Sequence, residues 1–218
     1  MPSFVLYDNK PTALMRLPHI IPGEREILMR PLRIAYGLIG SFFVVERLLR
    51  QGKSAKSFQE GQADRGSTRA IGAAFGRALL VLLVAPLLNW RRIGRLRRER
   101  VVWGGIAAML MGLVLRIWAS RVPGSFYTRT LRTEEEQHLI TEGPYQLIRH
   151  PGYLGSLLLW LGAGLATSNW IAITSISFPL LGSYWYRIQA EEAMLAKAFP
   201  QEYEGYASRT WRLIPFVY

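Results

Sequence analysis

Residues 143–155 read GPYQLIRHPGYLG, and they begin just before the longest run of residues without a charged side chain, 151–186. Proline fixes φ, and glycine permits backbone conformations that other residues resist. The Gly-Pro pair at 143–144 and the Pro-Gly pair at 151–152 therefore predict two turns that bracket a short, shaped segment. A polar, turn-rich segment at the start of an apolar run indicates a site.

The uncharged run predicts two helices. As one helix it would be about 54 Å long, nearly twice the ~30 Å hydrocarbon core of a bilayer. Polar Thr167, Ser168 and Asn169 interrupt it. We therefore expect a helical hairpin with arms at 153–166 and 171–190.

Three earlier apolar blocks are each long enough to cross a membrane, namely 31–49, 71–90 and 101–120. The sequence thus predicts an all-α membrane protein with about five transmembrane helices, the last two a hairpin, followed by an amphipathic C-terminal tail from residue 191. We expect a single membrane domain over 1–218. Residues 1–100 would hold an interfacial segment, including a helix within 12–30, and two spans, and residues 101–218 would hold the functional core.

Helix packing and buried charge add two expectations. Gly72 and Gly76 have the spacing that lets another helix approach closely. Glu46, Arg77 and Arg116 fall near one membrane face, the face that also carries residues 143–155. Intramembrane charges usually pair or line a cavity, so the arginines either reach the headgroups or neutralise Glu46, or the three charges line a polar cavity.

Composition excludes several classes of protein. The chain has no cysteine, so disulfides, thiolate metal sites and cysteine nucleophiles are absent. It has three histidines and no His-Glu-x-x-His pattern, so we expect no metal site. The net charge of +12 lies in short clusters beside apolar blocks. This pattern is typical of loops that face anionic lipid, so we expect membrane lipids as partners and no nucleic acid. No signal peptide is expected.

Charge leaves the orientation open. Basic residues outside the spans slightly favour the side of residues 143–155 as cytoplasmic, which would direct the site to the cytoplasm. The cluster of six arginines within 91–100 argues for the opposite orientation. The localisation predicted is an integral, multi-pass membrane protein of the plasma membrane or an endomembrane.

A second polar group follows the hairpin, at Arg187, Glu191 and Glu192. On a helix Arg187 and Glu191 share a face, and Glu192 is rotated by about 100°. One carboxylate can therefore meet a partner along the helix while the other points sideways. The alternative is that these residues form a solvated helix end.

Together the two groups resemble the C-terminal signature of the isoprenylcysteine carboxyl methyltransferase and phospholipid methyltransferase superfamily. The resemblance covers roughly residues 104–218 and depends on two motifs some forty residues apart. The residues that carry it are His138-Leu139-Ile140, Gly143-Pro144-Tyr145, Arg149-His150-Pro151, Tyr153, Gly155, Arg187, Glu191-Glu192, Leu195, Phe199, Tyr203, Tyr206 and Pro215.

The resemblance implies an enzyme that binds S-adenosylmethionine without a Rossmann domain and releases S-adenosylhomocysteine. The sequence agrees, because it contains no glycine-rich strand-to-helix fingerprint. Carboxylates would accept hydrogen bonds from the cofactor, aromatic rings would contact its adenine, and turn glycines would allow close approach. For His150 the alternative is a cap at the start of the hairpin. The expected cofactor-binding set is His138, Leu139, Gly143, Tyr145, Arg149, His150, Pro151, Tyr153, Gly155, Glu191 and Glu192.

The expected catalytic residues are Arg187 and Glu191. Methyl transfer requires orientation of the acceptor and exclusion of water. A carboxylate acceptor is already ionised, and Arg187 would fix it; an amine acceptor would need a base such as Glu191. The resemblance favours O-methylation of a lipophilic, isoprenylcysteine-type carboxylate from the bilayer. The alternatives are phospholipid N-methylation, thiol S-methylation, or a non-catalytic lipid-binding or assembly factor.

Overall fold

The computed structural model describes residues 22–49, 66–96, 98–122 and 139–217. The regular structure in these ranges is helical, which confirms the predicted all-α class. The elements are α1 (Pro22–Leu49), α3 (Ser67–Trp90), α4 (Glu99–Arg121), the short 3-10 helix η2 (Gly143–Gln146), α5 (Pro151–Ala166), α6 (Trp170–Ala198) and α7 (Pro200–Ala207).

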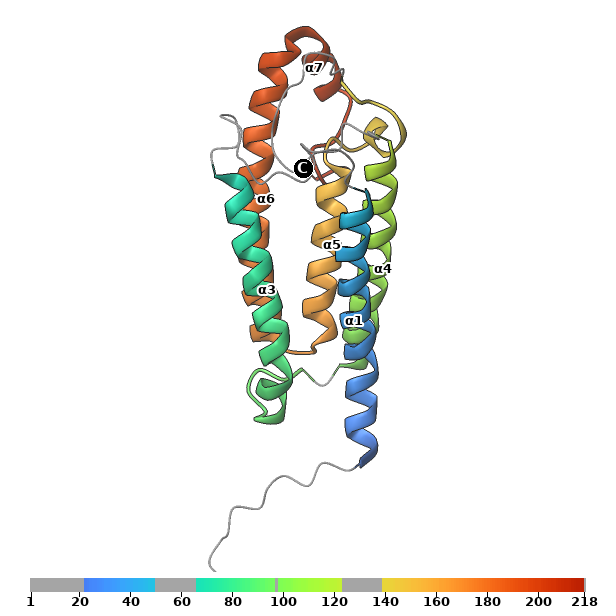
Figure 1. The fold of residues 1–218 in the computed structure, drawn as a ribbon, viewed down its shortest axis with the longest axis vertical. Coiled ribbons are helices and arrows are strands. Elements are labelled where there is room, and N and C mark those ends of the chain that lie inside the picture. The colour runs from blue at the N-terminus through green and yellow to red at the C-terminus, as the bar shows by residue number, and fades with distance from the viewer. Residues whose placement is uncertain (1–21, 50–65, 97, 123–138, 218) are drawn as a thin grey trace, which may run out of the picture.

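The five long helices lie side by side along one axis (Figure 1). α4 packs along α5, α3 packs along α6, and α1 contacts both α4 and α5. α7 and the C-terminal residues cover the end of the bundle where α5 begins (Figure 1). Residues 143–155 lie at this end, whereas the turn between α5 and α6 lies at the other.

A buried asparagine makes the turn of the predicted hairpin. Asn169 Oδ1 accepts hydrogen bonds from the backbone N–H groups of Ile171 and Ala172, at 3.0 and 3.2 Å, and so caps α6. Its Nδ2 donates to Asn89 Oδ1 at 2.8 Å and to the carbonyl of Ile93 at 2.7 Å. The predicted bend at 167–169 is confirmed, and it is tied to the end of α3.

Glycines bring α4 and α5 into direct backbone contact. A Cβ added at Gly112 would lie 2.5 Å from the carbonyl oxygen of Gly155, and one added at Gly105 would lie 2.6 Å from that of Gly162. Only glycine fits such an approach. These two contacts fix how α5 sits against α4, and therefore where α5 begins.

Within the described part of the chain, no helix makes the close approach that the spacing of Gly72 and Gly76 would allow. A Cβ added at either position would meet nothing within 4 Å. Both residues are exposed, because α3 turns its other face toward α6. The glycine spacing alone does not indicate which face of a helix meets a neighbour.

The helix ends differ from the predicted spans in two informative places. α1 begins at Pro22, so the predicted interfacial helix within 12–30 is, over its described residues, the first part of α1. α6 continues to Ala198, eight residues beyond the predicted arm. Arg187, Glu191 and Glu192 therefore lie on a helix, as predicted, and this helix rises past the start of α5, so the alternative of a solvated helix end is wrong.

Among the described helices, α3 and α4 are long and apolar enough to cross a membrane, and α5 is a shorter apolar helix of 16 residues. The interior of the bundle is aromatic. Trp160 of α5 is fully buried, stacks on Phe75 of α3 with ring centroids 5.0 Å apart, and meets Phe42 of α1 edge to face. Helices α1, α3 and α5 thus share one aromatic core.

Candidate functional site

The first turn predicted in 143–155 forms the short helix η2, whereas the Pro-Gly pair predicted as the second turn is the start of α5. Gly143 has a φ of +58°, a left-handed conformation that glycine adopts without strain, and it starts η2. Tyr145 donates a 3.1 Å hydrogen bond to the carbonyl of Ala119 at the end of α4. Pro151 is the first residue of α5, where its missing N–H costs no helical hydrogen bond. The segment is therefore held at both ends.

The C-terminal tail lies alongside the same segment. The N–H of Arg149 donates to the carbonyl of Trp211 at 2.8 Å, that of His150 to Arg212 at 3.2 Å, and that of Trp211 to Leu147 at 3.0 Å. Tyr206 of α7 donates at 2.7 Å to the carbonyl of Tyr145. This pairing brings residues some sixty positions apart into one wall.

Arg149 joins this wall to α6. Its Nε donates to Glu192 Oε1 at 3.0 Å. Its Nη1 donates to the carbonyl of Ala207 at 2.9 Å and to the carbonyl of Thr210. One guanidinium thus holds α6 and the tail together, as the fixed fork of arginine donors allows.

His150 and Tyr153 form an aromatic pair that faces the two glutamates. Their rings are stacked, with centroids 5.4 Å apart and planes inclined by 9°. Tyr153 donates a 2.6 Å hydrogen bond to Glu191 Oε2, and His150 Nε2 lies 3.3 Å from Glu192 Oε1. His150 is the N-cap residue of α5, but its side chain makes no capping hydrogen bond. The alternative, that the His150 side chain caps the start of the hairpin, is therefore wrong.

Glu192 is the ionic centre of the cluster. It accepts from Arg149 and His150, and Arg212 Nη2 lies 2.8 Å from its Oε2. Burial opposes ionisation of this carboxyl, but the hydrogen bonds from His150 and Arg149 outweigh burial and lower the pKa of Glu192 to about 2. Glu192 is therefore ionised at neutral pH and holds the elements around it.

Glu191 has a different environment. Its side chain keeps 26% of its surface exposed, against 11% for that of Glu192. It accepts from Tyr153, and His150 Nδ1 lies 3.7 Å from its Oε2. The two adjacent carboxylates share His150 but otherwise face different partners, in keeping with their predicted difference in direction. Glu191 is the more accessible of the two.

Arg187 lies one turn below Glu191 and is buried. Its Nε donates to the hydroxyl oxygen of Tyr153 at 3.1 Å, so Tyr153 bridges Arg187 and Glu191. Its Nη1 donates to the hydroxyls of Ser67 and Thr68 at 2.9 and 3.0 Å. The guanidinium is thus fixed by α3 on one side and by α5 on the other.

A buried ion pair supports the start of α5 from below. Arg116 of α4 donates through Nε to Glu46 of α1 at 2.6 Å and through Nη1 to the carbonyl of Gly152 at 2.8 Å. Both charged side chains are buried, so the expectation that an arginine neutralises Glu46 is confirmed. Arg77 is exposed and takes no part.

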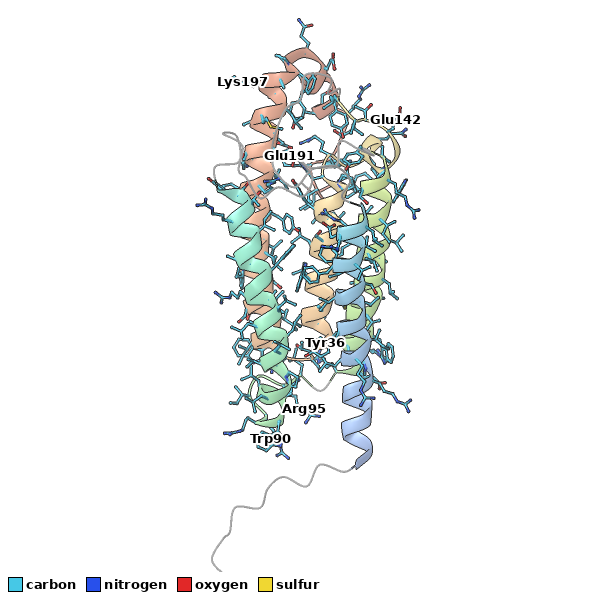
Figure 2. All side chains as sticks on the ribbon, viewed as in Figure 1. Tyr36, Trp90, Arg95, Glu142, Glu191 and Lys197 are labelled. Carbon is cyan, nitrogen blue, oxygen red and sulfur yellow. The ribbon has the colours of Figure 1, made fainter. Side chains whose placement is uncertain are left out.

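The structure brings most of the predicted site residues together at one end of the bundle. Figure 2 shows Glu191 at this end, with Trp90 and Arg95 at the opposite end. Gly155 lies deeper, in the contact between α4 and α5, and Leu139 is half-buried in the segment that leads to η2. His138 lies outside the described residues.

Sequence reasoning missed three members of the network, namely Arg212, Ser67 and Thr68. Arg212 stands between Tyr206 and Pro215, both of which carried the resemblance, so its neighbourhood was a usable signal. Ser67 and Thr68 fall between the predicted spans 31–49 and 71–90, and no sequence pattern joins them to Arg187.

The arrangement can do three things chemically. Stacked rings offer a face to a flat heterocycle. A partly exposed carboxylate can accept hydrogen bonds from, or attract, a cationic group. A buried guanidinium can fix an anion where few waters compete. All three lie within one contiguous hydrogen-bonded network.

Comparison with known proteins gives concordant results. The phospholipid methyltransferase family model matches residues 101–202. A probable protein-S-isoprenylcysteine O-methyltransferase of Oryza sativa subsp. indica is 34% identical over 119 residues, which cover 54% of this chain and 62% of the relative. The protein-S-isoprenylcysteine O-methyltransferase of Dictyostelium discoideum is 27% identical over 146 residues, which cover 66% of this chain and 62% of that relative. The chain therefore spans less than two thirds of the length of these relatives.

A solved structure shares the fold. The eukaryotic intramembrane Ras methyltransferase, isoprenylcysteine carboxyl methyltransferase, aligns with a TM-score of 0.58 at 22% sequence identity, covering 91% of this chain and 70% of that one. The alignment extends well beyond residues 101–202 and so includes helices of the N-terminal half. These matches confirm the resemblance that the two polar motifs indicated.

Proposed function

Residues 101–202 match the phospholipid methyltransferase family model, and we propose that this chain is an integral membrane methyltransferase of the isoprenylcysteine carboxyl methyltransferase and phospholipid methyltransferase superfamily that uses S-adenosylmethionine. The acceptor is a lipophilic carboxylate of the isoprenylcysteine type, reached from the bilayer. The observation that carries the proposal is the hydrogen-bonded chain from Arg187 through Tyr153 to Glu191. It joins an anion-fixing group to the wall that would hold the cofactor.

Five of the helices would cross the membrane in this proposal, namely α1, α3, α4, α5 and the lower part of α6. The polar network would then lie at one membrane face. This face would be the cytoplasmic one, the orientation that the count of basic residues outside the spans slightly favours.

The residues of the site fit the cofactor by their chemistry. S-adenosylmethionine, when bound, supplies a methyl group on a cationic sulfonium and also carries an ammonium group, ribose hydroxyls and a flat adenine. Glu191, with its partly exposed carboxylate, would accept hydrogen bonds from the amino group or the ribose. The stacked rings of His150 and Tyr153 would contact the adenine.

The other members of the predicted set would act on the shape of this wall. Glu192 and Arg149 would hold the tail against α6 through their ion pair. Gly143 and Pro151 would fix the two turns, and Tyr145 would anchor η2 to α4. Leu139, Gly155 and His138 are carried in the set by the resemblance.

Arg187 would orient the acceptor. A guanidinium is charged at neutral pH, and the burial of Arg187 strengthens its attraction for a carboxylate. A carboxylate oxygen needs no general base, so the task of the protein is to align the acceptor and exclude water. In the forward reaction the acceptor oxygen forms a bond to the methyl carbon as the bond from that carbon to sulfur breaks.

An amine acceptor is the second candidate, and the match to the phospholipid methyltransferase family model favours it. An amine must lose a proton when it is methylated, and Glu191 would accept that proton. A thiol acceptor would place the same demand on Glu191. In these cases Arg187 would have no acceptor carboxylate to fix.

The chemical stability of the product separates these candidates. Purified protein in detergent is incubated with methyl-labelled S-adenosylmethionine and either a prenylated cysteine acid or an aminophospholipid. A methyl ester releases labelled methanol in base, whereas an N-methyl or S-methyl group does not. We expect base-labile label, and we expect Arg187→Gln to abolish most of it. If label were found only in base-stable lipid, the acceptor would be an amine and the assignment of a carboxylate acceptor would be wrong.

A further inference from the structure

The hydroxyls of Ser67 and Thr68 fix the guanidinium of Arg187, although both residues lie outside residues 101–202, the segment that matches the family model. Arg187 Nη1 donates to Ser67 Oγ at 2.9 Å and to Thr68 Oγ1 at 3.0 Å. Its Nε donates in another direction, to Tyr153, at 3.1 Å. Because a guanidinium is planar and rigid, contacts to two of its edges determine how the group is oriented.

The environment of the two hydroxyls shows that this contact is built into the fold. Ser67 has no exposed surface and Arg187 is 4% exposed. A serine or threonine at the start of a helix commonly caps its own backbone. In α3 the N-cap residue is Gly66, and the hydroxyls of the two residues that follow it accept hydrogen bonds from Arg187.

The position of these residues in the chain is equally informative. The family model matches residues 101–202, which include Arg187, Tyr153 and Glu191. Ser67 and Thr68 lie on α3, before this segment, and α3 packs along α6 so that its first turn reaches Arg187. Arg187, which is proposed to contact the acceptor, is thus held by α3, a helix outside the segment that matches the family model.

We propose that Ser67 and Thr68 are positioning residues that orient the Arg187 guanidinium toward the methyl acceptor. This inference rests on the proposed function, in which Arg187 fixes the acceptor carboxylate. A long arginine side chain without these contacts samples several rotamers, and ordering it when the acceptor binds weakens affinity. The two hydroxyls remove that cost before the acceptor arrives. They act on acceptor binding and leave the cofactor wall at Glu191 and His150 in place.

The test compares a double variant with two matched controls in the full chain. Ser67→Ala with Thr68→Val removes both hydroxyls at nearly constant volume. Thr68→Ser keeps a hydroxyl and is the conservative variant. Ser183→Ala removes a hydroxyl from the same α3–α6 contact, where Ser183 donates to the carbonyl of Pro179 at 2.7 Å and reaches that of Ala70 at 3.4 Å. Ser183 has no contact with Arg187 among the hydrogen bonds described.

We expect the double variant to raise the KM for a prenylated cysteine acid by about tenfold, the size of effect typical for loss of one or two polar contacts. The affinity for S-adenosylhomocysteine, measured by calorimetry, should stay within about twofold. Thr68→Ser and Ser183→Ala should behave like the wild type. An unchanged KM would overturn the proposal, as would a KM that rises only in parallel with a loss of cofactor affinity.

A second measurement separates this inference from the proposed function. In protein labelled with ¹⁵N at arginine Nε, the Arg187 resonance, assigned by its loss in Arg187→Lys, reports side-chain order without any reaction. We expect slow exchange of its proton with water in the wild type and exchange at least about tenfold faster in the double variant. Equal exchange rates would overturn the positioning role. Absence of methyl transfer by the wild type, with the exchange difference present, would instead overturn the proposed function and the stated purpose of the contact.

Discussion

The hydroxyl of Tyr153 donates a 2.6 Å hydrogen bond to Glu191 and accepts one of 3.1 Å from Arg187, joining the first turn of α5 to α6. This residue connects the two sequence motifs that lie on either side of the apolar hairpin. It also connects the group proposed to fix the acceptor with the group proposed to hold the cofactor. Its removal should therefore affect both.

Tyr153→Phe keeps the ring that stacks on His150 and deletes only the hydroxyl. Arg187 and Glu191 each lose one part-buried hydrogen bond, so we expect kcat/KM for the acceptor to fall about 10- to 100-fold, or roughly 1.5–3 kcal/mol. Tyr36→Phe is the matched control, because its hydroxyl donates to the carbonyl of Leu82 away from the site. Equal losses in both variants would show that the effect is one of folding.

The pair of Glu46 and Arg116 should be needed for stability. Glu46→Gln removes the charge that neutralises a buried guanidinium, and loss of one partner of such a pair costs about 3–5 kcal/mol. We expect a clear fall in the thermal midpoint in detergent. Glu46→Leu combined with Arg116→Met replaces both charges by apolar groups, and should be more stable than Glu46→Gln. A double variant less stable than Glu46→Gln would contradict this explanation of the pair.

Acid should weaken the cluster around Glu192. Its pKa is lowered to about 2 in the folded protein from an ordinary value of 4.5, so the ionised form is favoured by folding. The stabilisation is fully present above about pH 4.5 and is lost as the pH falls toward 2. Glu192→Gln should lower stability at neutral pH and flatten this acid dependence. Glu202→Gln on α7, an exposed residue, is the control, and a similar flattening there would contradict the assignment.

The contact between α4 and α5 predicts a contrast between two glycine substitutions. Gly112→Ala places a Cβ 2.5 Å from the carbonyl oxygen of Gly155, so the helices must separate, at a cost of about 1–3 kcal/mol or more. Gly72→Ala meets nothing within 4 Å and should be neutral, or stabilising by up to about 1 kcal/mol through helix propensity. Thermal unfolding of the two variants checks this. Equal destabilisation would contradict the packing described.

The sequence was sufficient to predict the helices and the two motifs that meet. Periodicity and turn residues located the hairpin bend at Asn169, and proline and glycine located the turns around His150. Adjacent carboxylates on a helix must face different directions, so the separate environments of Glu191 and Glu192 followed as well. These features depend on local geometry, which neighbouring residues determine.

The rest depends on how distant helices are aligned. Nothing local shows that Gly112 meets a neighbour while Gly72 does not, or that Ser67 reaches Arg187 from 120 positions away. The role of Arg212 was hidden for the same reason, because it requires the tail to pair with residues 147–150. The predicted arm ended at residue 190 because the charged residues that follow were taken as the end of the membrane span. Their partners on α5 and the tail stabilise them within the same helix, which continues to Ala198.

Binding of S-adenosylhomocysteine to the purified full chain in detergent, measured by isothermal titration calorimetry, tests the central claim most directly. We expect saturable binding at about one site per chain, weakened at least about tenfold by Glu191→Gln, a loss of roughly 1.4 kcal/mol. Glu202→Gln should bind like the wild type. No measurable binding to a wild-type protein that still unfolds cooperatively on heating would contradict the account.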